Sequence, residues 1–431
     1  MTVTIRAVGQ ASKRGVIPRL PSEERLVADI GEWLSSSSSD TLRGQPHETP
    51  GDGSAALEFQ LHPAASHIRI AVAEGGTVTV AAATSPIGPG YHTYVAGVIR
   101  RLGEDLGIVW APAGASDDAA ATHDSTGFLE SGNRIDAERG HLAWLHRALL
   151  AAQGARARGI AGLHLETPPG VRFTFPGALA TVIGPRSEDW LDRAIADPRV
   201  AADVWPWVAD ATDARYLLGR AISLLWLEVR WRPPNDDEEV LLDEVLSLLH
   251  RAYPLEPSLP YPWAAWREIL DLRDQPDSAT RQLVERMAQK DEGEPEIGYR
   301  RSPVTILHGG WALEVPGDFT DLRTAEEWTG GDARRTVTIA ATETGRGGAP
   351  MTADEFLDEV AGHLGPDALE HEDGPVRGRA RLSTDDSSGV EVATVDGYSA
   401  VLGRGAAIRI VIADPQDWKW ALDTWRDLRP V

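Results

Sequence analysis

The sequence predicts an α+β protein in which a mixed N-terminal domain with a helical segment is followed by a C-terminal antiparallel sheet flanked by helices. Three observations predict this class. The 431 residues are 42% apolar and 25% charged, a globular composition long enough for two or three domains. Stretches with apolar residues at every second position alternate with stretches of helical spacing. A charged, broken stretch at residues 291–302 separates the last 129 residues from the rest.

Residues 1–54 are expected to form a flexible lead-in with one short helix. Ser22 is followed by two glutamates and by apolar residues at helical spacing, as at a helix N-terminus. The run Ser35 to Ser39 and the glycines and prolines after it contain little that could be buried. We therefore place the start of the folded body near Ala55.

The mixed domain predicted for residues 55–290 begins with a hairpin. His67–Ala73 and Thr77–Ala83 alternate apolar and polar residues, and two glycines between them form a turn. Helical spacing follows from Tyr94 to Leu106 and again over residues 137–153. Strand-like pieces cut by prolines come next, at Leu163–Glu166, Val171–Phe175 and Ala180–Ile183.

From Ser187 onward this domain becomes helical. Residues 212–230 and 236–252 each carry a broad apolar stripe, and Pro233 and Pro234 interrupt the helical pattern between them. Asn235 is a typical N-cap, and four acidic residues follow it where they complement the positive end of the helix dipole. Two antiparallel helices that pack together are therefore expected.

The domain predicted for residues 303–431 begins with strands at residues 311–316 and 336–344. Thr352 and Glu355 have the spacing of a capping box, so a helix begins there. Strands follow, with Asp396-Gly397 as a turn signal between two of them. Asp414 and Pro415 then predict the start of a closing helix.

This order of elements resembles the Mog1/PsbP/DcrB-like group of small α/β domains. The resemblance covers residues 303–431, and residues 1–302 show none that we recognise. It is carried by the strand Trp311 to Pro316, the Thr352-x-x-Glu355-Phe356-Leu357 helix, the segment Asp396 to Ala400, and the closing Asp414-Pro415-x-Asp417-Trp418-x-x-Ala421-Leu422 helix. What the resemblance implies is an antiparallel sheet flanked by helices that serves as a binding or chaperoning module, with no catalytic residues to transfer.

Charge and cysteine content restrict the partners and the compartment. The chain has 42 basic and 65 acidic residues, a net charge of −23, which argues against binding nucleic acid or an anionic membrane and is compatible with a basic protein partner. Residues 303–431 carry −11 (12 basic, 23 acidic), about twice as much per residue as residues 55–302. The absence of cysteine removes disulfides and thiolate metal sites, and no apolar run is long enough for a membrane span. A cytoplasmic protein without a cofactor is expected.

Common catalytic signatures are absent from the sequence, including phosphate-binding loops and zinc-protease motifs. The loop Ser85 to His92 comes closest to an active-site loop because it lies between a strand and a helix N-terminus. Two prolines in it remove amides that an anion would need. His164 and Glu166 share one face of a strand near the helix that carries His141 and His146, but the spacing does not favour a metal site, and none is predicted.

Aromatic residues gather in the helical part of the chain, where they fit either core packing or a surface for a partner. The candidates for partner binding are Tyr91, His92, Trp205, Trp207, Trp263 and Trp266. With the missing motifs and the acidic charge, they favour a non-catalytic protein-interaction factor: an adaptor, or an immunity or defence-associated protein. The alternative is an enzyme of unrecognised family with its site near the Ser85–His92 loop.

Overall fold

The computed structural model describes residues 2–12, 21–38, 40–50, 55–112, 121–160, 163–166, 178–274, 278–290, 296–324, 326–346, 349–385 and 392–431. The described chain is an α+β protein whose sheets are antiparallel. It divides into two compact units: Met1–Val229 with Pro233–Gly298, and Arg230–Arg232 with Tyr299–Val431. The change of unit after Gly298 falls inside the linker predicted for residues 291–302, of which 291–295 lie outside the described residues. Every described helix is too short or too polar to span a membrane.

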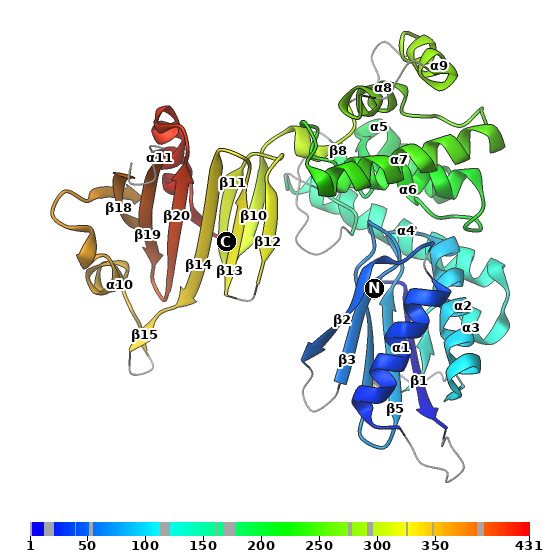
Figure 1. Ribbon diagram of the computed structural model, residues 1–431. Helices are drawn as coiled ribbons and strands as arrows, with labels where there is room; N and C mark the ends of the chain where they lie inside the picture. Colours follow the sequence, from blue (N-terminus) through cyan, green and yellow to red (C-terminus); the bar gives the residue numbers. More distant parts are fainter. Residues whose placement is uncertain are drawn as a thin grey trace. The chain divides into compact units, whose positions relative to one another are not determined.

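The first unit is built on a seven-stranded antiparallel sheet (Figure 1). The order is β2-β3-β4-β5-β1-β6, and β7 also pairs with β1. The strands are β1 (Thr4–Ala11), β2 (Arg43–Pro50), β3 (Ala55–Gln60), β4 (Ile68–Ala73), β5 (Thr77–Ala83), β6 (Ile108–Trp110) and β7 (His123–Asp124). The predicted hairpin is present as β4 and β5, and Gly75 and Gly76 in its turn have φ of 81° and 79°.

Residues 1–54 differ from the flexible lead-in predicted for them. β1 lies inside the sheet, paired with β5 on one side and with β6 and β7 on the other. The buried positions of β1 are Ile5, Ala7, Gly9 and Ala11. Three of these four residues are too small to give a strong apolar alternation, so the pattern of the strand was not recognisable. The short helix was predicted correctly: α1 (Glu23–Ser37) begins after Ser22, whose side chain accepts a backbone hydrogen bond.

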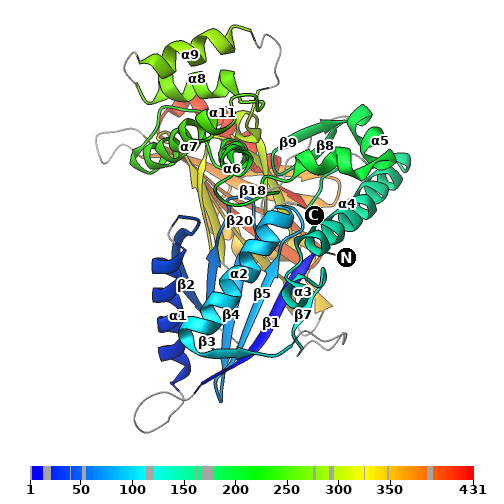
Figure 2. The same ribbon diagram turned by 90° about the vertical axis from the view of Figure 1, so that its right-hand side faces the viewer.

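Two helices cover one face of this sheet. α1 packs on β2, β3 and β4, while α2 (Pro89–Leu106) packs on β1 and β6 (Figure 2). Burial alternates along β4: Ile68, Ile70 and Val72 are buried, whereas Arg69 and Ala73 are exposed. The sheet therefore has a helix-covered face and a solvent face, as antiparallel sheets commonly do.

The rest of the first unit is mainly helical. Its elements are α3 (Phe128–Ser131), α4 (Arg134–Ala157), β8 (Ala178–Thr181), β9 (Gly184–Ser187), α5 (Glu188–Ala196), the 3-10 helix η1 (Pro198–Val204), α6 (Ala214–Leu227), α7 (Asp236–Leu255), α8 (Trp263–Leu272) and α9 (Ala279–Ala288). α6 and α7 are the predicted helix pair and pack against each other. Asn235 and Glu238 form a capping box at the start of α7. The strand predicted at 171–175 lies outside the described residues.

The described residues of the second unit form two antiparallel sheets, a short hairpin, two α-helices and three short 3-10 helices. A seven-stranded sheet has the order β12-β13-β14-β20-β19-β18-β17, and a three-stranded sheet the order β10-β11-β21. The strands are β10 (Val304–His308), β11 (Trp311–Val315), β12 (Thr320–Arg323), β13 (Glu327–Gly331), β14 (Arg335–Glu343), β15 (Gly345–Arg346), β16 (Ala349–Pro350), β17 (Leu369–Asp373), β18 (Val376–Asp385), β19 (Val392–Val401), β20 (Arg404–Ile412) and β21 (Arg429–Pro430). The helices are α10 (Ala353–Val360) and α11 (Trp418–Arg426).

The two faces of the seven-stranded sheet differ. Val337 and Ile408 belong to the buried face, which α11 covers with Trp425, and α11 packs on β11 as well. On the other face α10 packs at one end, where Phe356 contacts a cluster that includes Ala400. Beyond α10 this face carries a row of exposed and half-buried polar side chains.

One turn predicted in the second unit is absent. β19 continues through Asp396 and Gly397 as a single strand. A Cβ at position 397 would lie 2.7 Å from Cδ1 of Trp425, so the glycine permits close approach of α11 to the sheet. Asp396 accepts a hydrogen bond from Nε of Arg409 at 2.8 Å. The Asp-Gly pair therefore reflects helix packing on one face and an ion pair on the other.

Helix starts in the second unit follow the sequence closely. The predicted capping box of Thr352 and Glu355 is present at the start of α10. The closing helix differs slightly, because Asp414 caps a 3-10 turn at Pro415–Asp417 and the α-helix itself begins at Trp418.

Candidate functional site

The segment of residues 85–92 contains the connection from β5 to α2 and the first turn of α2, and it packs against residues 205–209. Gly88 has φ of 113°, and a Cβ there would lie 2.7 Å from the carbonyl oxygen of Trp207. A Cβ on Gly90 would lie 2.4 Å from a carbonyl oxygen of the same segment, and the Gly90 amide donates a 3.1 Å hydrogen bond to Trp207. The glycines of this loop thus allow two chain segments to approach closely, which explains them without a bound anion.

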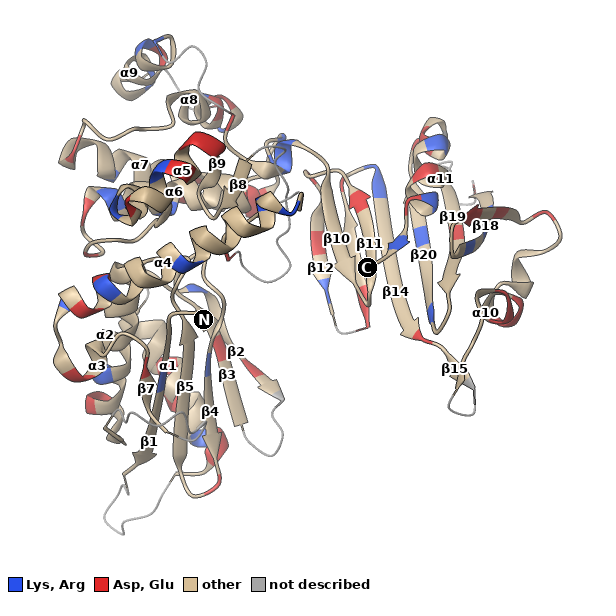
Figure 3. Ribbon diagram, turned by 180° about the vertical axis from the view of Figure 1, so that it is seen from behind, with Lys and Arg blue, Asp and Glu red and all other residues tan. Residues whose placement is uncertain are grey.

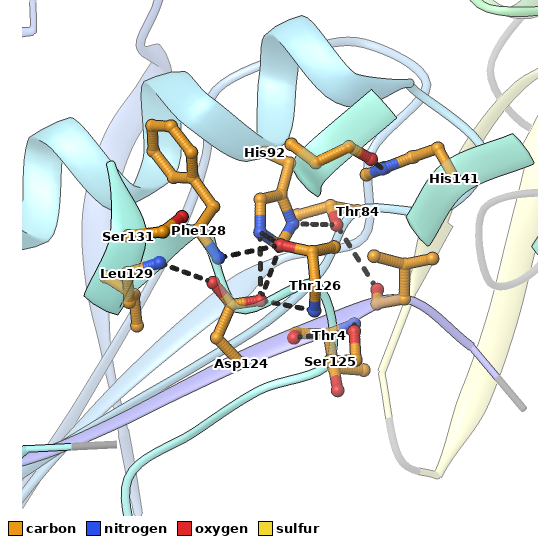
Figure 4. Close-up of polar contacts among 12 residues, drawn as sticks. Thr4, Thr84, His92, Asp124, Ser125, Thr126, Phe128, Leu129, Ser131 and His141 are labelled. Atoms are coloured by element: carbon orange, nitrogen blue, oxygen red, sulfur yellow. Dashed lines mark hydrogen bonds and ion pairs between the residues drawn. The ribbon is translucent and has the colours of Figure 1, made fainter. Parts of the chain in front are cut away.

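His92 lies at the centre of a hydrogen-bond network (Figure 4). Its Nδ1 is 2.9 Å from the Thr84 hydroxyl, and its Nε2 is 2.9 Å from the Thr126 hydroxyl and 3.1 Å from Oδ1 of Asp124. The Asp124 carboxylate also accepts hydrogen bonds from the amides of Thr126 and Leu129. Burial would raise the pKa of this carboxyl, but His92 and the two amides hold it well below its usual range.

The His92–Asp124 pair has the chemical groups of a general base but is enclosed. Neither side chain is exposed to solvent, and both ring nitrogens of His92 already have partners. The Thr84 hydroxyl in turn donates to the carbonyl of Val3. Proton transfer to a substrate needs a ring nitrogen within hydrogen-bond reach of that substrate. The network is therefore suited to joining β5, α2 and the segment around Asp124, a structural role.

His141 on α4 extends this buried polar region. Its ring centroid is 5.4 Å from that of His92, and its Nδ1 is 2.9 Å from the carbonyl oxygen of Ala137. Burial, followed by the positive charge on His92, lowers the pKa of His141 to about 4. His141 is therefore neutral at physiological pH.

The other residues considered for a metal site lie nearer the surface. His164 and Glu166 are exposed, and so is His146 on α4. Partial burial raises the pKa of Glu166, and a hydrogen bond with Ser85 opposes that rise. Ser85, His92, His141 and Glu166 thus belong to one region. Among the described residues no group of three or more His, Asp or Glu side chains is arranged to hold a metal.

The six side chains predicted to bind a partner are all buried. They are Tyr91, His92, Trp205, Trp207, Trp263 and Trp266. Trp207 has no exposed surface, and its ring centroid lies 4.2 Å from that of Tyr216 and 5.5 Å from that of Tyr91. The Trp205 indole donates a 3.0 Å hydrogen bond to the carbonyl of Ser85. This burial corresponds to the core-packing alternative, and in this structure the six side chains offer no surface to a partner.

Trp263 and Trp266 form a second aromatic group. Their rings stack with centroids 5.5 Å apart and an angle of 7° between planes. Tyr253 and Tyr261 pack edge-on or tilted against them. These four rings join the end of α7 to α8 and are part of the core.

Sequence reasoning missed a network of charges in the first unit. The Arg220 guanidinium, 5% exposed, donates to Oε1 of Glu244 at 2.7 and 3.1 Å. Oε2 of Glu244 accepts a 2.8 Å hydrogen bond from Arg43, which also pairs with Glu228. Burial raises the pKa of Glu228, and the Arg43 charge opposes the rise. The network joins β2 to α6 and α7, and no sequence spacing could reveal it, because its members come from distant segments.

Acidic residues are concentrated in one part of the second unit. Residues 353–380 contain eight acidic residues and two arginines, so they carry −6 of the −11 in residues 303–431. We call the eight residues the acidic edge: Asp354, Glu355, Asp358, Glu359, Asp367, Glu370, Glu372 and Asp373. Figure 3 shows the acidic side of α10. The domain's charge excess is therefore local, and it lies on α10, β17 and the segment between them.

Two arginines of β18 neutralise part of the acidic edge. Arg379 lies 2.7 Å from Asp358 of α10 and 3.7 Å from Glu370 of β17, and Arg377 lies 3.1 Å from Glu372. The three carboxylate side chains remain 70%, 77% and 72% exposed, respectively. Such exposed pairs contribute little to stability, so these carboxylates stay available to another cation.

A shallow hollow of about 270 Å³ lies on the open face of the same sheet. Ala340, Ala407 and Gly397 contribute small residues to it, and Tyr398 and the Arg409–Asp396 ion pair line it as well. This volume suits one or two side chains of a docked protein rather than a large cofactor.

Comparison with known proteins identifies no family. No protein-family model matches the chain, and no curated protein matches it. Among solved structures, the chain is similar to a protein from Bacteroides thetaiotaomicron VPI-5482 determined at 1.50 Å resolution. The identity is 11% and the TM-score 0.24, over 29% of this chain and 47% of that one. The match thus spans about half the length of that protein.

Proposed function

We propose that this protein is a non-catalytic interaction factor, an adaptor or an immunity or defence-associated protein, that binds a basic protein through its C-terminal unit. The observation that carries the proposal is the acidic edge. It concentrates a net charge of −6 within residues 353–380. Acidic surfaces of this kind attract basic partners, speed their association and make it sensitive to salt.

The resemblance of residues 303–431 to the Mog1/PsbP/DcrB-like group supports the same proposal, because that group serves as binding or chaperoning modules. The six aromatic candidates named from the sequence do not contribute a surface, since they are buried. The enzyme alternative is not favoured, because His92 has no exposed surface and both its ring nitrogens are engaged.

Affinity capture with matched variants tests the proposal. The full chain, Asp358→Asn/Glu370→Gln/Glu372→Gln, and the control Glu314→Gln/Glu326→Gln/Glu327→Gln would each be used on lysate of the native host. The control removes the same number of exposed charges from the same unit. We expect one binder to be captured by the full chain and the control, and at least about tenfold less of it by the acidic-edge variant.

Salt provides a second readout in this experiment. Raising ionic strength shortens the Debye length to about 3 Å at 1 M, so the captured protein should elute with salt. Equal capture by all three proteins would contradict the proposal, as would the absence of any salt-sensitive binder.

A further inference from the structure

β17, the last strand of the seven-stranded sheet, has a described neighbour on one side. It pairs residue by residue with β18, and no other described strand lies beyond it. Four of its five residues are exposed, and His371 is half-buried. A strand in this position presents backbone amide and carbonyl groups to which another strand can hydrogen-bond.

Glu370 and Glu372 of β17 point to the same face of the sheet because they are two residues apart. They lie opposite Arg379 and Arg377 of β18. Adjacent strands are about 4.8 Å apart. A strand added to the free side of β17 would thus lie one inter-strand distance from β17, which carries the glutamates, and two inter-strand distances from β18, which carries the arginines. Its side chains would meet negative charge first.

Helix α10 adds a third carboxylate to this face. Asp358 is 70% exposed and contacts Arg379, the arginine that Glu370 also approaches. Because Asp358 shares that arginine, part of the positive charge behind Glu370 is already neutralised. Asp358, Glu370 and Glu372 thus outnumber the two arginines that they contact, and the two glutamates lie next to the side of β17 that no described strand pairs.

A second copy of this chain does not suit this position. Pairing β17 with β17 of another molecule would bring Glu370 and Glu372 near glutamates of the same charge. Like charges on adjacent strands are destabilising. A strand with cationic side chains at alternate positions would instead form opposite-charge pairs with both glutamates.

We propose, on the basis of the function proposed above, that β17 accepts an extended segment of the basic partner as an eighth strand. Arg or Lys side chains two residues apart in that segment contact Glu370 and Glu372. Backbone hydrogen bonds supply affinity, and the carboxylates select the charge and spacing of the side chains.

Synthetic peptides binding to the full chain test this proposal. The probe is a peptide with Arg at alternate positions and Thr or Val between them. Two matched forms are N-methylated on the odd or the even backbone amides, which keeps the charge and removes hydrogen-bond donors from one side of the strand. A third form has Gln in place of Arg. Fluorescence anisotropy gives the affinities, and hydrogen exchange shows which amides become protected.

We expect the basic peptide to protect the amides of β17, and one of the two N-methylated forms to bind at least about tenfold more weakly. Glu370→Gln/Glu372→Gln should weaken binding by a similar factor, whereas the control Glu326→Gln/Glu327→Gln should not. Equal binding by the parent and both methylated forms would overturn strand addition and leave charge-based binding intact. If the Gln peptide binds as well as the Arg peptide, the charge basis of the proposed function fails instead.

Discussion

The buried neutral His141 should make the stability of the first unit depend on pH. The pKa of an unperturbed histidine is near 6.5, and burial followed by the charge on His92 lowers that of His141 to about 4. The unfolded chain therefore binds a proton between these pH values that the folded chain does not. Stability is full above pH 6.5 and falls as the pH decreases toward 4. The linked free energy is about 2 kcal/mol at pH 5 and about 3 kcal/mol below pH 4.

His141→Leu removes this contribution, so the variant should lose less stability on acidification than the natural chain. Urea unfolding at about pH 8, 6 and 5 measures the effect, with hydrogen exchange in peptides of α4 identifying the transition of the first unit. The difference in unfolding free energy between the two proteins should change by about 2 kcal/mol from pH 8 to pH 5.

His146→Leu is the matched control, because His146 is on the same helix and exposed. It should leave the pH dependence as in the natural chain. Some acid sensitivity will persist in His141→Leu, since burial also lowers the pKa of His62 well below its usual value. The reasoning would be refuted if the difference in unfolding free energy between the natural chain and His141→Leu stayed constant from pH 8 to pH 5.

Three further substitutions test the packing described above. Gly90→Ala should destabilise the first unit by about 2 kcal/mol because its Cβ meets a carbonyl, whereas Gly97→Ala, with its nearest neighbouring atom at 3.9 Å, should be neutral or stabilising in thermal melts. Asp124→Asn should lower the free energy of unfolding of the first unit by about 3 kcal/mol, because it leaves His92 without its carboxylate partner. Faster hydrogen exchange at residues 124–129 would report this loss, and an unchanged melting curve would contradict it. Gly397→Ala should lower the melting temperature of the second unit through its contact with Trp425, with equal melting of variant and natural chain as the contrary result.

Local structure in this chain was predictable where one segment contains the whole signal. The N-cap at Asn235, the capping box at Thr352, the double-glycine hairpin and the α6–α7 pair depend on residues within a few positions of one another. Hydrogen bonds of caps and turns form over such short distances, so the sequence shows both partners together. The α+β class followed from these elements.

Features that depend on distant partners could not be predicted in the same way. β1 lies inside the sheet because β5 and β6 pair with it from far along the chain, and its small buried residues hid the strand pattern. Gly397 resembled a turn residue, but its role is set by Trp425 on the opposite layer. Likewise, nothing near Arg220 in sequence indicates the ion pair with Glu244 and Arg43.

The sequence by itself determined the acidic charge, the lack of thiol chemistry and the concentration of carboxylates in residues 353–380, because composition does not depend on folding. Tertiary structure decided which side chains are accessible. It buried the four tryptophans predicted to bind a partner, together with His92, and left Glu370 and Glu372 exposed on a strand that no other described strand pairs on its outer side. The physical reason is that burial depends on contacts between distant segments. Removing an apolar ring from water is favourable, whereas removing a charged group from water without a partner is unfavourable.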